Sequence, residues 1–455
     1  MTASSLNSRE KRAAVSLASV FAFRMLGLFM LMPVLAIYGQ QLEGFSPLWI
    51  GFAIGAYGLT QAVLQIPMGW LSDKIGRKKV IIGGLCVFAL GSVIAATAES
   101  VQMVTLGRAL QGMGAIASAL LALASDLSRD EQRPKVMAVI GMCIGMSFAV
   151  AMLLGPIVAA SWGVAGVFWL TAGLALLGIF IVLFLVPNAV SKAPKGDTLA
   201  TLDDIKQLIK HPQLARLDFG VMLLHLTLTT VFVALPGQLI KDGLIADHHW
   251  YLYIPVLFLA FFLMAPMMIV AIRKEKEKQA FIASIALLVL SMLAMSLWVD
   301  SVIGIGICML VYFIAFNFLE ATMPALVSRI APANQKGSAM GVFSSTQFFG
   351  AFLGGLLGGY VAQALSAQAV FAAAALVGVI WLIIAWNMQV PPRSKIISLM
   401  TELSSEQQAQ ALASRLVALP GVIEATVVCD ENRSYLKIND KEFDLDQARK
   451  VAGLI

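Results

Sequence analysis

Residues 69–79 read GWLSDKIGRKK, and this stretch decides how the rest of the chain is interpreted. It holds one carboxylate, four cations and two glycines in eleven residues, and an apolar run long enough to cross a bilayer flanks it on each side. Charges are costly inside lipid and common at its surface, while glycines mark tight turns. We therefore interpret residues 69–79 as a tight loop on one face of a membrane.

The overall composition agrees with this interpretation. Of 455 residues, 59% are hydrophobic and only 13% are charged, and the mean hydropathy is +0.85. A water-soluble chain of this length would not have such values, so we expect a membrane protein with many spanning segments. The four cysteines are scattered, which predicts small buried hydrophobic side chains and no metal site.

Twelve apolar runs have about the length that a helix needs to span the hydrocarbon core. The first reaches Tyr38 without the small-residue cleavage pattern of a signal peptide, so we interpret it as a retained helix. The runs lie at 13–38, 48–71, 80–98, 101–124, 134–160, 165–187, 216–240, 250–272, 279–298, 301–326, 337–363 and 368–388.

The basic residues near the ends of these runs are distributed unequally. Twenty-one lie at one set of ends, whereas the opposite set holds only Lys241. Basic residues accumulate on the cytoplasmic side, so both termini are expected to be cytoplasmic. The net charge of +6 follows from this distribution and is no evidence for nucleic-acid binding.

The chain also shows a weak internal repeat at an offset near 200 residues, in which Pro33 corresponds to Pro236 and Pro67 to Pro266. This predicts an all-α membrane protein with two six-helix halves and a site between them. The expected segments are a cytoplasmic N-terminus (1–12), the first half (13–187), a cytoplasmic linker (188–215), the second half (216–388), a short linker (389–394) and a small α+β domain (395–455).

The last segment has the order β-α-β-β-α of a ferredoxin-like domain without its final strand. It resembles heavy-metal-associated domains around residues 421–427, but the loop that carries two cysteines in those domains has none here, and Cys429 is alone. We therefore expect a regulatory or oligomerisation domain rather than a metal carrier.

Four ionisable residues lie deep within the predicted spans: Arg24, Arg108, His225 and Glu320. They belong to the first, fourth, seventh and tenth spans, which a nested three-helix repeat would place around one axis. His225 lies nine residues after Arg216 and Glu320 nine before Arg329, so both are roughly 13 Å from the cytoplasmic face.

The equal depth of His225 and Glu320 suggests that they meet across a cavity and carry a proton there. For Glu320, the alternative is a structural pair with a cation or a helix cap. His225 could equally be a hydrogen-bonded core residue, and Arg108 a hub that binds backbone carbonyls. For Arg24, substrate contact and pairing with a carboxylate both remain open.

Three motifs resemble those of the major facilitator superfamily. The first joins the second and third spans, the second lies in the fourth span, and the third, in the fifth span, resembles the signature of the proton-coupled antiporter branch. Their residues are Gly69, Leu71, Asp73, Gly76, Arg77 and Lys78; then Arg108, Gln111, Gly112 and Gly114; then Gly145, Gly155 and Pro156.

The resemblance implies a conformational latch on the cytoplasmic side. Asp73, Arg77 and Asp126 would form a charge relay, with Asp73 resting on the amino end of the eleventh span. That end carries Gly337 and Gly341, which would leave backbone N–H groups accessible to a carboxylate. Breaking this contact would let the cytoplasmic side open.

Together these features predict a monomeric secondary transporter of the bacterial cytoplasmic (inner) membrane. It would export small amphipathic or drug-like compounds in exchange for protons, and it would be neither an enzyme nor dependent on a cofactor. The chain has no G-x-x-x-x-G-K-[ST] phosphate loop, G-x-S-x-G elbow or H-E-x-x-H helix. Two alternatives are a proton-coupled symporter of a sugar or metabolite, and a membrane sensor that signals through residues 395–455.

Overall fold

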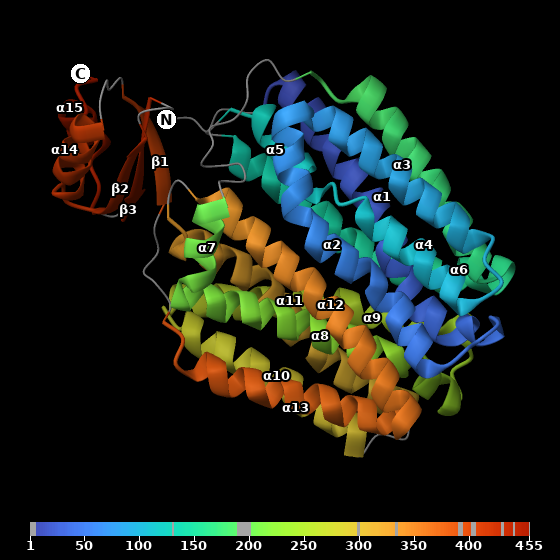
Figure 1. The fold of residues 1–455 in the computed structure, drawn as a ribbon. Helices are drawn as coiled ribbons and strands as arrows, with labels where there is room; N and C mark the ends of the chain where they lie inside the picture. Colours follow the sequence, from blue (N-terminus) through green and yellow to red (C-terminus); the bar gives the residue numbers. More distant parts are fainter. Residues whose placement is uncertain are drawn as a thin grey trace.

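The computed structural model describes residues 6–129, 132–188, 202–297, 301–332, 335–389, 395–401, 406–428, 432–439 and 442–454. Residues 189–201 of the predicted linker 188–215 and residues 390–394 of the predicted linker 389–394 lie outside these ranges, as does Cys429. Figure 1 shows two helical bundles side by side and a small separate domain that contains the strands.

The first bundle is built from α1 to α6 and two short helices. Its elements are α1 (Ser8–Tyr38), η1 (Gly39–Gln41), α2 (Pro47–Ile75), α3 (Arg77–Ala96), α4 (Val101–Met113), α5 (Ala117–Asp126), α6 (Arg133–Phe180) and η2 (Ile181–Leu185).

A short amphipathic helix, α7 (Leu202–Lys210), precedes the second bundle. The elements of the bundle are α8 (Pro212–Lys241), η4 (Ala246–His248), α9 (Trp250–Arg273), α10 (Glu277–Leu297), α11 (Val302–Ile330), α12 (Lys336–Ala364) and α13 (Ala367–Trp386).

The prediction of twelve spans is confirmed, although two boundaries differ. Within the described ranges, eleven stretches are long and apolar enough to cross a membrane, and the longest has 51 residues. That stretch, Lys135–Leu185, bends at Gly163 (φ 64°) and therefore contains the predicted fifth and sixth spans. Conversely, the predicted fourth span is broken between α4 and α5, where a side chain at Gly114 would overlap the carbonyl oxygen of Gly84 on α3.

The C-terminal domain has the predicted order: β1 (Lys395–Met400), α14 (Glu406–Val417), β2 (Val422–Val428), β3 (Arg433–Ile438) and α15 (Leu445–Val451). β3 lies between β1 and β2 and is antiparallel to both. An apolar core beneath the sheet includes Leu399, Leu416 and Leu436. These strands and helices form the small α+β domain that the sequence predicts.

The two ends of the bundles differ in charge. We call the end that carries Lys74, Arg129 and Arg273 the basic end, and the other the opposite end. α1 and α12 begin at the basic end, whereas α2 begins at the opposite end. The C-terminal domain lies beyond the end of the bundles where α5 and α7 are found (Figure 1).

The two bundles meet most closely along α2 and α12, which lie side by side in Figure 1. A side chain on Gly51 would overlap the carbonyl oxygen of Gly355 and lie 2.8 Å from the Cα of Gly359. A Cβ on Gly58 would lie 2.5 Å from the carbonyl oxygen of Phe348. Only residues without a side chain allow two helix backbones to approach so closely, and this glycine interlock covers the part of α2 nearest the opposite end.

Candidate functional site

The structure arranges the four deep ionisable residues as two pairs, one in each bundle. His225 of α8 and Glu320 of α11 are in direct contact, with 3.1 Å between Nε2 and Oε2. Arg24 of α1 and Arg108 of α4 both lie over the ring of Tyr57. The two pairs come from the helices that the sequence suggested, but they form two separate clusters.

A third side chain completes the cluster in the second bundle. The amide nitrogen of Gln347, on α12, lies 2.7 Å from His225 Nε2 and donates to Glu320 Oε1 at 3.1 Å. Gln347 was missed by the sequence analysis because a neutral amide in a span carries no charge to mark it. The Glu320 side chain is 38% exposed, so this carboxylate deep within α11 is only partly covered by the protein.

The geometry of this cluster allows two hydrogen-bonded arrangements, which depend on whether His225 Nε2 carries a proton, and a change of tautomer or of net charge can convert one into the other. Nε2 of an imidazole either carries a proton or offers one lone pair. When it carries the proton, His225 donates to Glu320 Oε2; when it does not, its lone pair accepts from the amide of Gln347. The cluster therefore has two hydrogen-bonded arrangements that differ in the protonation of Nε2.

The cluster in the first bundle is buried and cationic. Arg24 and Arg108 are each 1% exposed, and their guanidinium carbons lie 5.8 and 5.0 Å from the centre of the Tyr57 ring. Arg108 donates to Gln111 Oε1 at 2.8 Å and to the carbonyl of Ala53 at 3.4 Å. These contacts fit the hub that the sequence analysis left open for Arg108.

Arg24 has fewer partners than Arg108. It donates through Nη2 to Oε1 of Gln61, whose amide in turn donates to Gln65. Both glutamines lie on α2 and are almost fully buried. Nε and Nη1 of Arg24 have no hydrogen-bond partner in the described part of the chain.

The two clusters are neighbours across the interface between the bundles. The ring of Tyr57 packs edge-on against Phe348 of α12, with centroids 6.2 Å apart. Phe348 directly follows Gln347 in the chain. A displacement of α12 relative to α2 would therefore disturb both clusters.

The residues of the first motif form a compact ionic network at the basic end. Arg77 pairs with Asp73 and donates to Asp126 Oδ2 at 3.0 Å. The side chains of Asp126 and Arg77 are only 1% and 6% exposed, whereas that of Asp73 is 26% exposed. Gly76 adopts φ 106° between α2 and α3, a conformation that favours glycine and makes the one-residue turn possible.

The contact of Asp73 with the amino end of α12 stays a prediction. Gly337 and Gly341 do lie in the first two turns of α12, where Gly341 is buried. Gly69 accepts a hydrogen bond of 2.6 Å from the Ser72 hydroxyl through its carbonyl oxygen.

Lys78, also part of the first motif, contacts the residues that follow η2. Its ammonium donates to the carbonyl of Val186 at 2.6 Å and to the side chain of Asn188 at 2.7 Å. A cation at the carboxyl end of a helix satisfies its last carbonyls. Lys78 therefore fastens α3 to the end of η2 within the first bundle.

The third motif has two kinds of glycine. A Cβ on Gly155 would lie 2.7 Å from the carbonyl oxygen of Met30, whereas one on Gly145 would meet nothing within 4 Å. Pro156 lies inside α6. Gly155 thus allows α6 to pack on α1, while Gly145 leaves an open place on the surface of α6.

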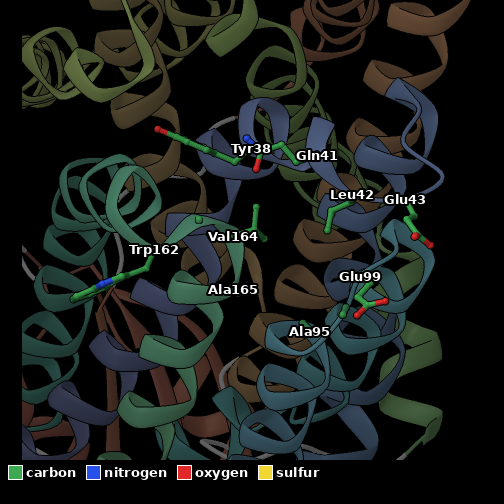
Figure 2. A pocket seen from close by; sticks show the side chains of 11 residues that line it. Tyr38, Gln41, Leu42, Glu43, Ala95, Glu99, Trp162, Val164 and Ala165 are labelled. Atoms are coloured by element: carbon green, nitrogen blue, oxygen red, sulfur yellow. The ribbon is translucent and has the colours of Figure 1, made fainter.

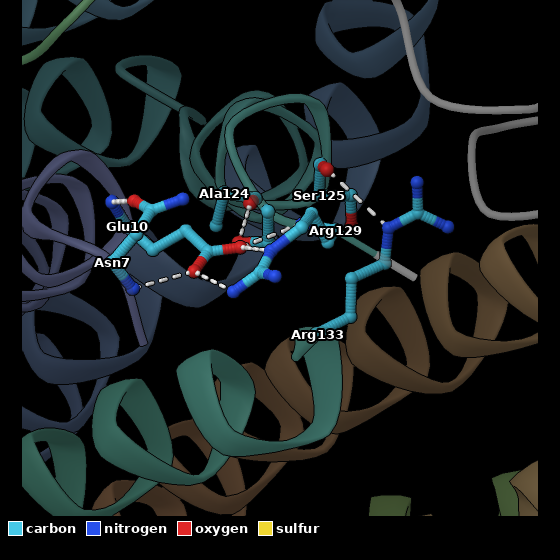
Figure 3. Close-up of polar contacts among 7 residues, drawn as sticks. Asn7, Glu10, Ala124, Ser125, Arg129 and Arg133 are labelled. Atoms are coloured by element: carbon cyan, nitrogen blue, oxygen red, sulfur yellow. Dashed lines mark hydrogen bonds and ion pairs between the residues drawn. The ribbon is translucent and has the colours of Figure 1, made fainter. Parts of the chain in front are cut away.

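A second ion pair at the basic end was not predicted from the sequence. Both carboxylate oxygens of Glu10 accept from the guanidinium of Arg129, each at 2.9 Å, and Glu10 also forms a capping box with Asn7 (Figure 3). Arg133 donates to the carbonyl of Ser125 nearby. The start of α1 is thereby fixed to the segment between α5 and α6.

A cavity of about 450 Å³ lies at the opposite end of the first bundle, between the ends of α1 and α3 and the bend in α6. Figure 2 shows Glu43 and Glu99 on one side of it and Trp162 on the other. It contains none of the residues that the sequence analysis selected. Both carboxylates are exposed.

The C-terminal domain contacts the basic end through Lys437 of β3. The ammonium of Lys437 lies 3.4 Å from the carbonyl oxygen of Ala331, just after α11, and 3.8 Å from Glu424 Oε2. Burial lowers the pKa of Lys437, and Glu424 partly offsets that effect. The contact joins the domain to the end of the helix that carries Glu320.

Comparisons with known proteins agree with the fold. Residues 17–354 and 217–420 match the profile described as Major Facilitator Superfamily. The chain is 43% identical to "Inner membrane transport protein YajR" of Escherichia coli (strain K12), over 97% of this chain and 98% of that protein. It is 33% identical to "Uncharacterized transporter BU466" of Buchnera aphidicola subsp. Acyrthosiphon pisum, over 77% of this chain and 90% of that protein.

Among solved structures, the chain is similar to a bacterial homologue of the human lysosomal transporter Spinster. The TM-score is 0.67 at 14% identity, and the match covers 84% of this chain and 97% of that one. At this identity the likeness concerns the fold alone.

Proposed function

The chain belongs to the Major Facilitator Superfamily, and from this premise we propose that it exports small amphipathic compounds across the bacterial inner membrane in exchange for protons, by alternating access. The observation that carries the proposal is the cluster of His225, Glu320 and Gln347, in which two ionisable side chains lie in contact and the hydrogen bonds depend on whether His225 Nε2 carries a proton. An ionisable group this deep in a span is energetically costly, and such groups usually mark a path for ions or protons.

The packing of the bundles supports an alternating-access cycle. The glycine interlock of α2 and α12 closes the opposite end, and Tyr38 adds a hydrogen bond of 2.9 Å to Asp247 there. Towards the basic end, α5 packs on helices of the first bundle and α11 on helices of the second. With the basic end cytoplasmic, we propose that this arrangement is the state in which Glu320 is accessible from the cytoplasm.

The proposal is tested by transport in liposomes. A thermal-shift screen of the purified protein first identifies a stabilising compound, whose uptake is then measured with an imposed pH difference. An exporter that exchanges its substrate for protons accumulates the compound when the lumen is acidic. Accumulation only when the lumen is alkaline would instead support the symporter, and uptake indifferent to the pH difference would contradict proton coupling.

Two substitutions in the latch at the basic end should change the free energy of unfolding and the transport activity to different extents. Asp126→Asn removes the charge from a buried partner of Arg77 and should lower the free energy of unfolding by about 3 kcal/mol. Asp73→Asn affects a more exposed carboxylate and should cost only about 1 kcal/mol, yet it should abolish transport while insertion stays normal.

Both variants are measured by thermal unfolding and by uptake. Exposed Lys79→Gln, in the first turn of α3 close to this network, serves as the control for a changed charge at the basic end. Full transport by Asp73→Asn would exclude the latch.

One observation favours the sensor as a second candidate. Lys437 links the C-terminal domain to Ala331 at the end of α11, so a ligand on that domain could act on the helix that carries Glu320. Deletion of residues 393–455 distinguishes the two functions. Retained uptake by the shortened protein supports a transporter, whereas loss of a cellular response with transport unchanged supports a sensor.

A further inference from the structure

Arg24 is a buried cation without a counter-ion in the described part of the chain. It is 1% exposed, and its only hydrogen bond there is to the neutral side chain of Gln61. Its Nε and Nη1 groups have no hydrogen-bond partner among the described residues. A buried guanidinium is costly to keep unless an anion pairs with it, so the part of the chain that the structure describes leaves this charge without a neutralising partner.

A second buried cation, Arg108, lies near Arg24 and adds to the positive charge. Arg108 lies over the same ring of Tyr57, and it too has no carboxylate partner among the described residues. The buried acids Glu10 and Asp126 of this bundle are paired at the basic end with Arg129 and Arg77. The interior of the first bundle therefore holds two cations and lacks an anion to balance them, within the ranges the structure describes.

The groups next to Arg24 are suited to binding an anion. Gln61 and Gln65 provide amides, and the hydroxyl of Tyr57, also buried, has no hydrogen-bond partner in the described ranges. An arginine donates to carboxylate, phosphate or sulfonate oxygens through charge-assisted hydrogen bonds. Among the described residues, Nε and Nη1 of Arg24 and the hydroxyl of Tyr57 are thus donors that remain available to such a ligand.

We propose that Arg24 binds an anionic group of the transported compound, so that the substrates are amphipathic carboxylates, phosphates or sulfonates. This inference rests on the proposed function, because it assigns the substrate class of the same transporter. Tyr57 packs on Phe348, the neighbour of Gln347. The anion on Arg24 and the proton on the His225–Glu320–Gln347 cluster then occupy facing sides of one interface, which separates when the bundles move.

The first test is the stability of the ligand-free protein. Arg24→Gln keeps an amide next to Gln61 but removes the unpaired charge, so it should raise the melting temperature by about 2–4 °C while impairing uptake. Exposed Lys241→Gln at the opposite end removes an equal charge and should change neither. A lower melting temperature for Arg24→Gln would show that the guanidinium is a structural element, and would overturn the proposal.

The second test is the charge of the ligand. Benzoate, phenylphosphate and benzenesulfonate are compared in thermal-shift binding with benzamide, with benzyltrimethylammonium, and with chloride and inorganic phosphate. The aryl anions should raise the melting temperature of the wild-type protein. They should raise that of Arg24→Lys by a smaller amount and leave that of Arg24→Gln unchanged. Equal responses to anionic and neutral aryl probes would overturn the proposal, as would responses to inorganic anions that match those to aryl anions.

These outcomes are independent of proton coupling. If the wild-type protein ignores the pH difference but binds aryl anions through Arg24, only the proposed exchange with protons fails. If uptake follows the pH difference and Arg24→Gln transports aryl anions as well as the wild type does, only the anion site fails.

Discussion

Glu320→Gln should reduce uptake into acid-loaded liposomes to the level of liposomes without protein, while exchange of labelled for unlabelled substrate continues. Glutamine has the shape of glutamate and can still hydrogen-bond to His225 and Gln347, but it cannot carry the exchanged proton. Removing the proton site should leave the substrate-loaded protein able to change its access. Only the step driven by the pH difference is lost.

The matched control for Glu320→Gln is Glu99→Gln, which removes one exposed carboxylate at the opposite end. It should transport as the wild type does. Gln347→Leu keeps both ionisable groups but removes the amide that donates to His225 when Nε2 carries no proton, so it should weaken the response to the pH difference without abolishing it. Undiminished pH-driven uptake by Glu320→Gln would show that another group carries the proton.

Gly51→Leu should prevent the opposite end from closing and reduce transport to background. The new side chain would overlap the carbonyl oxygen of Gly355, so α2 and α12 must separate. Overpacking costs about 1–3 kcal/mol, and because the penalty applies only to the closed state, it shifts the equilibrium about 5- to 150-fold. Spin labels on Phe45→Cys and Leu365→Cys, both exposed at the opposite end, should report a longer distance.

The control for Gly51→Leu is Gly83→Leu on α3, where an added Cβ meets nothing within 4 Å. This variant should keep the wild-type distance distribution and wild-type transport. A Gly51→Leu protein with both properties unchanged would mean that the close approach of α2 and α12 is no part of the cycle.

The large features of the fold could be predicted because hydropathy and charge act over whole segments. Each span must be apolar over its full length, so all twelve spans and the small α+β domain follow from the sequence. Local backbone geometry could not be obtained in this way. Gly114 and Gly163 are two glycines among many, and only the packing of α3 and the bend in α6 show why the chain breaks at the first and bends at the second.

The candidate site was predictable only where charge marks it. His225 and Glu320 could be paired because their distances from the charged ends of their helices are equal, and they lie in contact. Gln347 and Tyr57 could not be found, since neutral side chains are ordinary in a span and their partners come from other helices. The arrangement of all four ionisable residues around one axis stays a prediction, while the structure adds that the arginines lie on Tyr57 and the other two residues contact Gln347.

The most direct test of proton coupling is infrared difference spectroscopy of the protein in lipid, because it detects the carboxyl proton of Glu320 itself. The spectra of acidified and neutral samples are subtracted for the wild type, Glu320→Gln and Gln347→Leu. We expect a protonated-carboxyl C=O band in the wild type that is absent in Glu320→Gln and shifted in Gln347→Leu. Identical carboxyl bands in the wild type and Glu320→Gln would contradict the account.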